Sequence, residues 1–138
     1  MYRLHYFAEP GRAEIARLCF AIGEIPYEDV TYSEEEFAAA KSGLPFGQVP
    51  LLELPDGRRL AQSLAIDRFL AGLSGLLPAD PWQAAQADMV ALHMHDFVNL
   101  FTPSFFMPPA ESLAAQRELL AGAAHTKLLQ LATIVSQP

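Results

Sequence analysis

The feature that most restricts the fold is a change in hydrophobic pattern at Leu73, after which no strand-like segment occurs. Before Leu73, short alternating or aromatic-rich runs are interleaved with segments whose apolar residues recur every three or four positions. The predicted order is strand, helix, strand, helix, strand, strand, helix, at residues 2–7, 11–22, 26–31, 33–41, 51–54, 59–62 and 63–73. A right-handed parallel crossover followed by a hairpin predicts a mixed four-stranded sheet with helices on its faces.

The rest of the chain predicts helices alone. Asp80 and Pro81 supply a helix N-cap and a proline at the first helical position, and prolines between residues 102 and 109 predict a break. The predicted organisation is one domain at residues 1–73, a linker at 74–81 and a helical segment at 82–138, with long helices at 82–101 and 112–135.

Apolar spacing and capping residues predict which helix faces point inward and where the helices begin. On the first helix the predicted inward face consists of Ile15, Leu18, Cys19 and Ile22, and on the third it consists of Ile66, Phe69, Leu70 and Leu73. Ser33 is predicted to cap the second helix, with Glu36 completing a capping box. Ser63 is predicted to cap the third helix.

Composition excludes several classes of protein. The net charge of −7 and the absence of a basic stripe argue against nucleic-acid binding, which requires clustered Lys and Arg. A single cysteine, Cys19, allows no internal disulfide. The sequence has no signal-peptide pattern and no apolar run of the roughly 20 residues that cross a membrane. We therefore expect a soluble, cytoplasmic protein without a membrane partner.

Three segments in the first half resemble one known family. Residues 2–17 (YRLHYFAEPGRAEIAR) place a tyrosine near the end of the first strand and GRAE at the start of the first helix. Residues 44–50 (LPFGQVP) end in proline, and residues 62–70 (QSLAIDRFL) open the third predicted helix. In this order they resemble the glutathione transferases of the sigma, prostaglandin D synthase-like type. The resemblance implies a thioredoxin-like α/β domain followed by an all-helical domain.

The resemblance also implies a site for glutathione as co-substrate, with Tyr6 and Arg12 as catalytic residues. The implied glutathione contacts are Tyr6, Phe7, Arg12, Phe37, Lys41, Gly47, Gln48, Val49, Pro50, Gln62, Ser63 and Asp96. A thiol with a pKa of about 8.5 is mostly protonated at neutral pH, whereas the thiolate is the nucleophile. A hydroxyl that donates a hydrogen bond to the sulfur favours the thiolate, and this is the role implied for Tyr6. Without the resemblance, Tyr6 would be read as an ordinary strand aromatic.

Several of these residues have specific implied roles. The peptide bond before Pro50 is expected to be cis, with the backbone of Val49 pairing with the cysteinyl part of glutathione. Gln62 and Ser63 are expected to bind the γ-glutamyl carboxylate, because a hydroxyl and N–H groups at a helix N-terminus form an anion site. Phe37 replaces the tryptophan of the sigma type and so lacks an indole N–H donor, while Lys41 can meet the glycyl carboxylate.

The helical half raises questions of partner and metal. Asp96 either reaches the glutathione site of a partner subunit in a homodimer, as the resemblance implies, or is a solvated helix acid. His93 and His95 stand two positions apart and so point to different helix faces, which argues against a metal site formed by His93, His95 and Asp96. The absence of a C-x-x-C motif argues against a thioredoxin-like reductase, and Cys19 on an apolar stripe is expected to be inert.

Two functions remain open. The first is a glutathione transferase that joins glutathione to a small hydrophobic electrophile or isomerises a substrate with glutathione as cofactor. The second is a catalytically weak or inactive glutathione-transferase-like binding or structural protein. The resemblance implies a further buried helix, and nothing after Val135 corresponds to it, so the helical domain is expected to be shortened. The sequence does not identify the electrophile.

Overall fold

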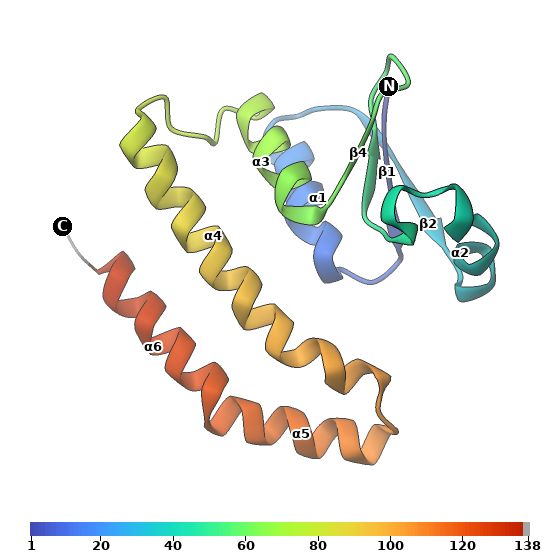
Figure 1. Ribbon diagram of the computed structural model, residues 1–138. Coiled ribbons are helices and arrows are strands. Elements are labelled where there is room, and N and C mark those ends of the chain that lie inside the picture. Colours follow the sequence, from blue (N-terminus) through green and yellow to red (C-terminus); the bar gives the residue numbers. More distant parts are fainter. Residues whose placement is uncertain (137–138) are drawn as a thin grey trace. The chain divides into compact units, whose positions relative to one another are not determined.

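The computed structural model describes residues 1–136, and these divide into an N-terminal unit (Met1–Asp80) and a C-terminal unit that begins at Pro81 (Figure 1). The N-terminal unit contains β1 (Tyr2–Phe7), η1 (Gly11–Ala13), α1 (Glu14–Ile22), β2 (Tyr27–Tyr32), α2 (Glu34–Ala40), η2 (Lys41–Gly43), η3 (Pro45–Gly47), β3 (Leu51–Glu53), β4 (Arg59–Ala61) and α3 (Ser63–Leu73). The C-terminal unit contains α4 (Pro81–Phe101), η4 (Thr102–Phe106), α5 (Pro109–Ala121) and α6 (Ala123–Val135).

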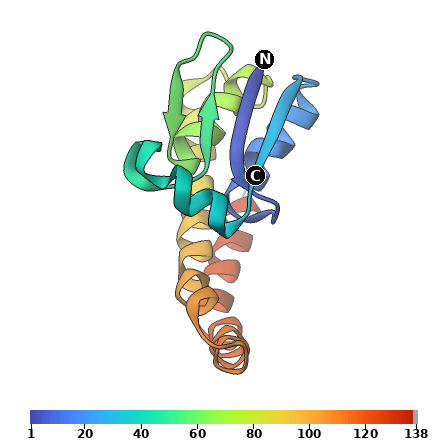
Figure 2. The ribbon, with the colours of Figure 1, turned by 90° about the vertical axis from the view of Figure 1, so that its right-hand side faces the viewer.

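The sheet of the N-terminal unit is mixed and four-stranded, as predicted. Its order is β2-β1-β3-β4, with β1 parallel to β2 and antiparallel to β3, and β3 antiparallel to β4 (Figure 2). Tyr6 pairs with Thr31 of β2 one residue before β1 ends at Phe7. The β-α-β crossover therefore brings the end of β1 and the start of the first helix to one edge of the sheet.

The core lies where α1 and α3 pack together against the sheet. Leu4 and Leu52 from the sheet meet Phe20 of α1 and Ile66 and Leu70 of α3, all fully or almost fully buried. The ring of Phe20 also stacks on Tyr27, with centroids 4.2 Å apart. These contacts fix the helix N-termini relative to the strand ends.

The predicted inward face of α1 is wrong at three of its four positions. Ile15, Leu18 and Ile22 are 52%, 51% and 60% exposed, and only Cys19 is buried. The face that meets the core is formed instead by Ala13, Ala16, Cys19 and Phe20. Small alanine side chains let the helix backbone approach the sheet closely, and a ranking by hydrophobicity does not favour such residues.

Helix caps follow the sequence in one case and depart from it in another. Ser33 caps α2, and the reciprocal hydrogen bonds of the predicted capping box with Glu36 are both present. Ser63 is not the N-cap of α3, because the helix begins at Ser63 and the cap position is occupied by Gln62. On the third helix Leu73 is exposed, whereas Ile66 and Leu70 are buried as predicted.

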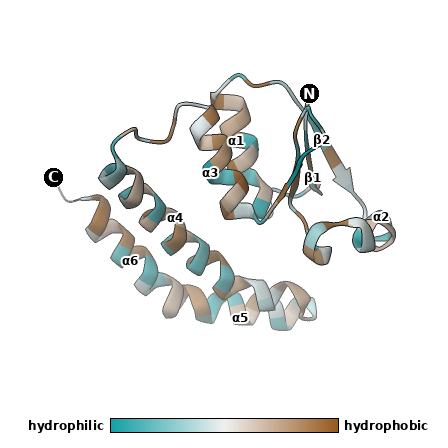
Figure 3. Cartoon of the chain, turned by 45° about the horizontal axis from the view of Figure 1, so that its top comes forward, coloured by the Kyte–Doolittle hydropathy of each residue, from teal (hydrophilic) through white to brown (hydrophobic). Residues whose placement is uncertain are grey.

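The C-terminal unit corrects the prediction of one helix at residues 112–135. Helix α5 begins at Pro109 and ends at Ala121, and α6 begins at Ala123 after a break at Gly122. The backbone of Gly122 has φ −122° and ψ −104°, far from helical values. Figure 3 shows hydrophobic and hydrophilic residues mixed along α5 and α6, on either side of the break.

Helices α4 and α6 are joined by polar contacts around Lys127. The Nε2 atom of His93 lies 2.8 Å from the carbonyl oxygen of Lys127, and the Lys127 ammonium lies 3.3 Å from the Asp96 carboxylate. Asp96 is thus ion-paired within its own unit.

Among residues 1–136, no helix is both long enough and apolar enough to cross a membrane.

Candidate functional site

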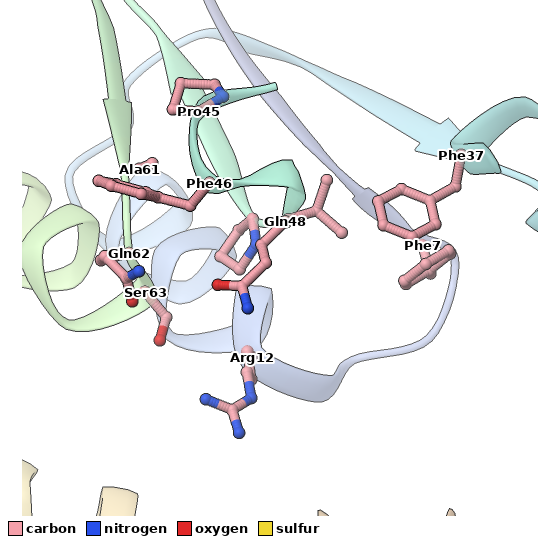
Figure 4. Close-up of a pocket in the computed structure, with 11 residues that line it drawn as sticks. Phe7, Arg12, Phe37, Pro45, Phe46, Gln48, Ala61, Gln62 and Ser63 are labelled. Atoms are coloured by element: carbon pink, nitrogen blue, oxygen red, sulfur yellow. The ribbon is translucent and has the colours of Figure 1, made fainter. Parts of the chain in front are cut away.

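A pocket of about 270 Å³ lies in the N-terminal unit beside the ends of β1 and β4 (Figure 4). Five chain segments contribute to it: the end of β1, η1, α2, the loop before β3, and the junction of β4 with α3. The lining residues are Phe7, Arg12, Phe37, Pro45, Phe46, Gln48, Val49, Pro50, Ala61, Gln62 and Ser63. Eight of these eleven belong to the set predicted from the sequence.

Tyr6 is tied to the start of the first helix. Its Oη atom accepts a hydrogen bond from the backbone N–H of Arg12 at 3.0 Å. A phenolic hydroxyl can accept hydrogen bonds and still donate its own hydrogen. The bond from Arg12 therefore fixes the position of Oη without using the hydrogen that a bound anion would need.

Gly11 makes this close approach possible. Its φ is +44°, a backbone conformation that favours glycine. A β-carbon at this position would lie 2.6 Å from Tyr6 Oη and 2.9 Å from Tyr6 Cε1, well inside van der Waals contact. Any side chain here would displace either the ring or the loop.

The loop before β3 lines the opposite side of the pocket. The Val49–Pro50 peptide bond is cis, as predicted. Figure 4 shows the polar ends of Gln48, Ser63 and Arg12 directed towards the same side of the pocket. Phe46, in η3, has φ +60° and its side chain is 76% exposed, which holds an aromatic ring at the rim.

The start of α3 contributes Gln62 and Ser63. Gln62 has φ 74° and ψ 116°, an uncommon conformation for a residue other than glycine, and such conformations cluster at ligand-binding sites. Its carbonyl oxygen accepts the N–H groups of Ala65 and Ile66, which starts the helix. The N–H groups of a first helical turn have no partners within the helix, so this end of the pocket suits an anion.

Aromatic residues form the wall towards α2. The rings of Phe7 and Phe37 meet edge to face, 5.2 Å apart. The Lys41 ammonium lies 5.9 Å from the centre of the Phe37 ring, and a β-carbon at Gly47 would lie 3.6 Å from Lys41 Cγ. Lys41 and Gly47 therefore lie beside the pocket lining without belonging to it.

The pocket is electrostatically one-sided. Among its described lining residues there is one cation, Arg12, and no acid. Asp67, a half-buried acid of this unit, is not among the lining residues, and burial raises its pKa to about 7. Burial, and then the charge of Asp67, raise the pKa of the Cys19 thiol, which keeps that thiol protonated and unreactive.

Some lining residues are absent from the set predicted from the sequence, and some predicted residues do not line the pocket. Pro45, Phe46 and Ala61 line the pocket but are not among the predicted residues, although Pro45 and Phe46 lie inside the 44–50 motif. Tyr6 is not itself a lining residue but accepts a hydrogen bond from the backbone of Arg12, which is one, and Asp96 lies in the other unit. Within the described part of the chain, no three His, Cys, Asp or Glu side chains are grouped to hold a metal ion.

Comparison with known proteins supplies the context of this pocket. The sequence profile of the glutathione S-transferase N-terminal domain matches residues 2–72. The chain is 44% identical over 96 residues to glutathione S-transferase S1 of Drosophila melanogaster, covering 70% of this chain and 38% of that protein. It is 45% identical over 100 residues to hematopoietic prostaglandin D synthase of Gallus gallus, covering 72% and 50%.

Solved structures agree. Rat hPGDS complexed with a quinoline matches with a TM-score of 0.88 and 34% identity, covering 99% of this chain and 68% of that one. The Fasciola hepatica sigma class GST matches with a TM-score of 0.80 and 29% identity, covering 94% and 63%. The chain thus spans half or less of the length of these two curated relatives and about two thirds of these solved chains.

Proposed function

Because the chain belongs to the glutathione S-transferase family, we propose that its N-terminal unit binds glutathione and activates the thiol for transfer to a small hydrophobic electrophile or for a glutathione-dependent isomerisation. The observation that carries this proposal is the hydrogen bond from the Arg12 N–H to Tyr6 Oη at 3.0 Å, beside a pocket with one cation and no lining acid. A hydroxyl fixed in this way can donate its hydrogen to a sulfur atom, and that donation favours the thiolate.

The proposed arrangement of glutathione assigns each end of the tripeptide to a part of the pocket. The γ-glutamyl carboxylate binds at the start of α3, on Gln62 and Ser63. The cysteinyl backbone pairs with Val49 beside the cis bond to Pro50, which presents its sulfur to Tyr6. The glycyl carboxylate lies towards Lys41. Exposed backbone groups and a helix N-terminus are well suited to an extended peptide with charged ends.

The remaining assignments concern class and assembly. We assign the chain to the sigma type, supported by its similarity to the Fasciola hepatica sigma class GST and to the prostaglandin D synthases. We propose a cytoplasmic homodimer in which Asp96 reaches the partner's glutathione. In that arrangement Asp96 must leave, or share, the Lys127 ammonium that lies 3.3 Å away.

The test measures thiol activation directly, because that step depends only on the proposed site in the N-terminal unit. Glutathione binding is measured by calorimetry, and the pKa of the bound thiol by the ultraviolet absorbance of the thiolate. We expect wild-type protein to lower that pKa below its free value of about 8.5. Tyr6→Phe should restore the free value, bind glutathione almost unchanged and lose roughly 10- to 1,000-fold in turnover.

Tyr27→Phe is the matched control, since it removes a hydroxyl from a ring that stacks on Phe20 in the core rather than beside the pocket. An unshifted thiol in the wild-type complex, or a Tyr6→Phe variant equal to wild type, contradicts the proposed activation. Binding with a lowered pKa but no turnover with any electrophile would favour the alternative of a glutathione-binding protein without useful catalysis.

A further inference from the structure

Arg17 of α1 is not among the residues that line the pocket, and it binds the segment that connects Tyr6 to Arg12. Its Nη2 donates to the carbonyl oxygen of Phe7 at 2.8 Å. Its Nη1 donates to the carbonyl oxygens of Glu9 at 3.0 Å and Pro10 at 3.4 Å. Three of the four carbonyl groups between residues 7 and 10 are therefore held by one side chain.

The same guanidinium is anchored from the other side by β2. Nε donates to the Asp29 carboxylate at 2.8 Å, and Nη2 lies 3.4 Å from the second carboxylate oxygen. The Arg17 side chain is only 14% exposed. Burial disfavours the charge, but the hydrogen bond and attraction of Asp29 outweigh it and raise the pKa of Arg17. The cation is thus permanent, and its three nitrogens are all engaged.

The guanidinium also lies over the ring of Tyr6, 5.9 Å from its centre. At this distance a cation attracts the electron-rich face of the ring. Arg17 therefore contacts both parts of the proposed thiol-activating pair: the ring that carries the hydroxyl, and the loop that delivers the Arg12 N–H to it.

We propose that Arg17 is the positioning residue of this site, which holds the 7–10 segment in place and so keeps the Arg12 N–H on Tyr6 Oη. Its relevance to thiol activation rests on the proposed function, but the positioning itself does not. A planar guanidinium can donate to several carbonyls and a carboxylate at once, whereas a lysine ammonium is a single point of charge on a flexible chain. Lysine should keep the charge and lose the positioning.

The primary test is amide hydrogen exchange of Arg12, followed by NMR in the full chain without ligand. Arg17→Lys should speed Arg12 exchange by roughly 10- to 100-fold, as expected for the loss of one hydrogen bond to a charged group. The amide of Leu4, in the buried middle of β1, serves as the internal reference for global unfolding. Asp29→Asn should produce a smaller change in the same direction, because it loosens the anchor and leaves Arg17 present.

Arg3→Lys is the matched control. Arg3 of β1 is ion-paired with Glu28 of β2 at 2.9 Å. Its ion pairs are with Glu28 and Glu53, and neither residue belongs to the 7–10 segment. We expect wild-type exchange at Arg12 in this variant. Equal exchange at Arg12 in Arg17→Lys and wild type, or equal acceleration at Arg12 and Leu4, overturns the positioning role.

The second readout separates this proposal from the proposed function. With glutathione bound, Arg17→Lys should raise the pKa of the bound thiol towards its free value while changing glutathione affinity less than about threefold. If wild-type protein does not lower the pKa of the bound thiol, the proposed function fails. The exchange rate of the Arg12 amide still decides the positioning role in that case. If wild type and Arg17→Lys lower the pKa of the bound thiol equally, Arg17 has no part in thiol activation.

Discussion

Asp67 provides the sharpest test of how this fold is stabilised. It lies in α3 close enough to α1 to act on the Cys19 thiol. Its Oδ1 atom is buried and has no hydrogen-bond partner among the described residues. Burial raises the pKa of the carboxyl from 3.8 to about 7. The folded N-terminal unit therefore carries an acid that is ionised at a cost at physiological pH.

The size and sign of the effect follow from proton linkage. The pKa of Asp67 is raised by about three pH units, and each unit corresponds to about 1.4 kcal/mol. The cost of ionising Asp67 in the folded protein therefore has an upper limit of about 4 kcal/mol. Water reaches part of the carboxyl and screens it, which reduces the expected cost to about 1–3 kcal/mol. Between about pH 4 and about pH 7 the folded state holds a proton that the unfolded state has released. Stability contributed by this group is therefore lost as the pH rises through that window.

Asp67→Asn should remove this dependence. Relative to wild type, the variant should be about 1–3 kcal/mol more stable above about pH 7, with the gain shrinking towards about pH 4. Burial lowers the pKa of His5, so His5 contributes stability that is lost as the pH falls below 6.5, the opposite trend. Taking the difference between the two proteins cancels this contribution, since His5 is present in both.

The assay is urea unfolding followed by tyrosine absorbance, because all four tyrosines of the chain lie in the N-terminal unit. Glu35→Gln, an exposed position in α2, controls for the loss of one negative charge. A stability difference between Asp67→Asn and wild type that is constant from about pH 4 to about pH 8 would refute the reasoning, as would a gain confined to low pH.

Two further substitutions test local features of the site. Gly11→Ala and Gly75→Ala both place a side chain at a positive φ. Gly75→Ala should cost about 1 kcal/mol and Gly11→Ala more, because only Gly11 would drive a β-carbon into the Tyr6 ring. Only Gly11→Ala should therefore raise the pKa of the thiol of bound glutathione. Equal thiol ionisation in both variants contradicts the packing argument. Ser33→Ala should weaken α2 by about 0.5–2 kcal/mol through loss of the capping box, seen as faster amide exchange in α2, with Ser42→Ala as the control; unchanged exchange argues against the cap.

Local signals in the sequence were sufficient for the elements of the N-terminal unit. The strands at Tyr2–Phe7 and Tyr27–Tyr32 are aromatic or β-branched and are flanked by turn residues, and the capping box before Glu34 marks a helix start within a few residues. The break at Gly122 was missed for a physical reason. An isolated glycine costs a helix about 1 kcal/mol, which does not by itself predict a break. Helices α4, α5 and α6 contact one another on either side of Gly122, and such contacts between helices cannot be read from the sequence pattern.

Helix orientation was less predictable than helix location. The i, i+3, i+4 pattern selected Ile15, Leu18 and Ile22 because their spacing places three large aliphatic residues on one side of α1, yet the core accepts Ala13, Ala16 and Phe20. Close contact between a helix and a sheet rewards small residues beside one large ring. A pattern that weighs only hydrophobicity cannot distinguish that face from one left exposed. The same preference for local signals assigned the α3 cap to Ser63, when the positive φ of Gln62 sets the helix start.

The two arginines at the start of the first helical segment show how far the sequence alone can predict the site. Arg12 and Arg17 stand five positions apart in GRAEIAR, and nothing in that string separates a pocket cation from a structural one. What separates them is the surroundings: Arg12 lines the pocket, while Arg17 binds Asp29 on β2 and three backbone carbonyls of the 7–10 segment. Asp29 comes beside those carbonyls only after the parallel β1–β2 crossover has formed. The acceptors for Arg17 are therefore products of the fold, and its positioning role follows from the β-α-β topology rather than from the motif.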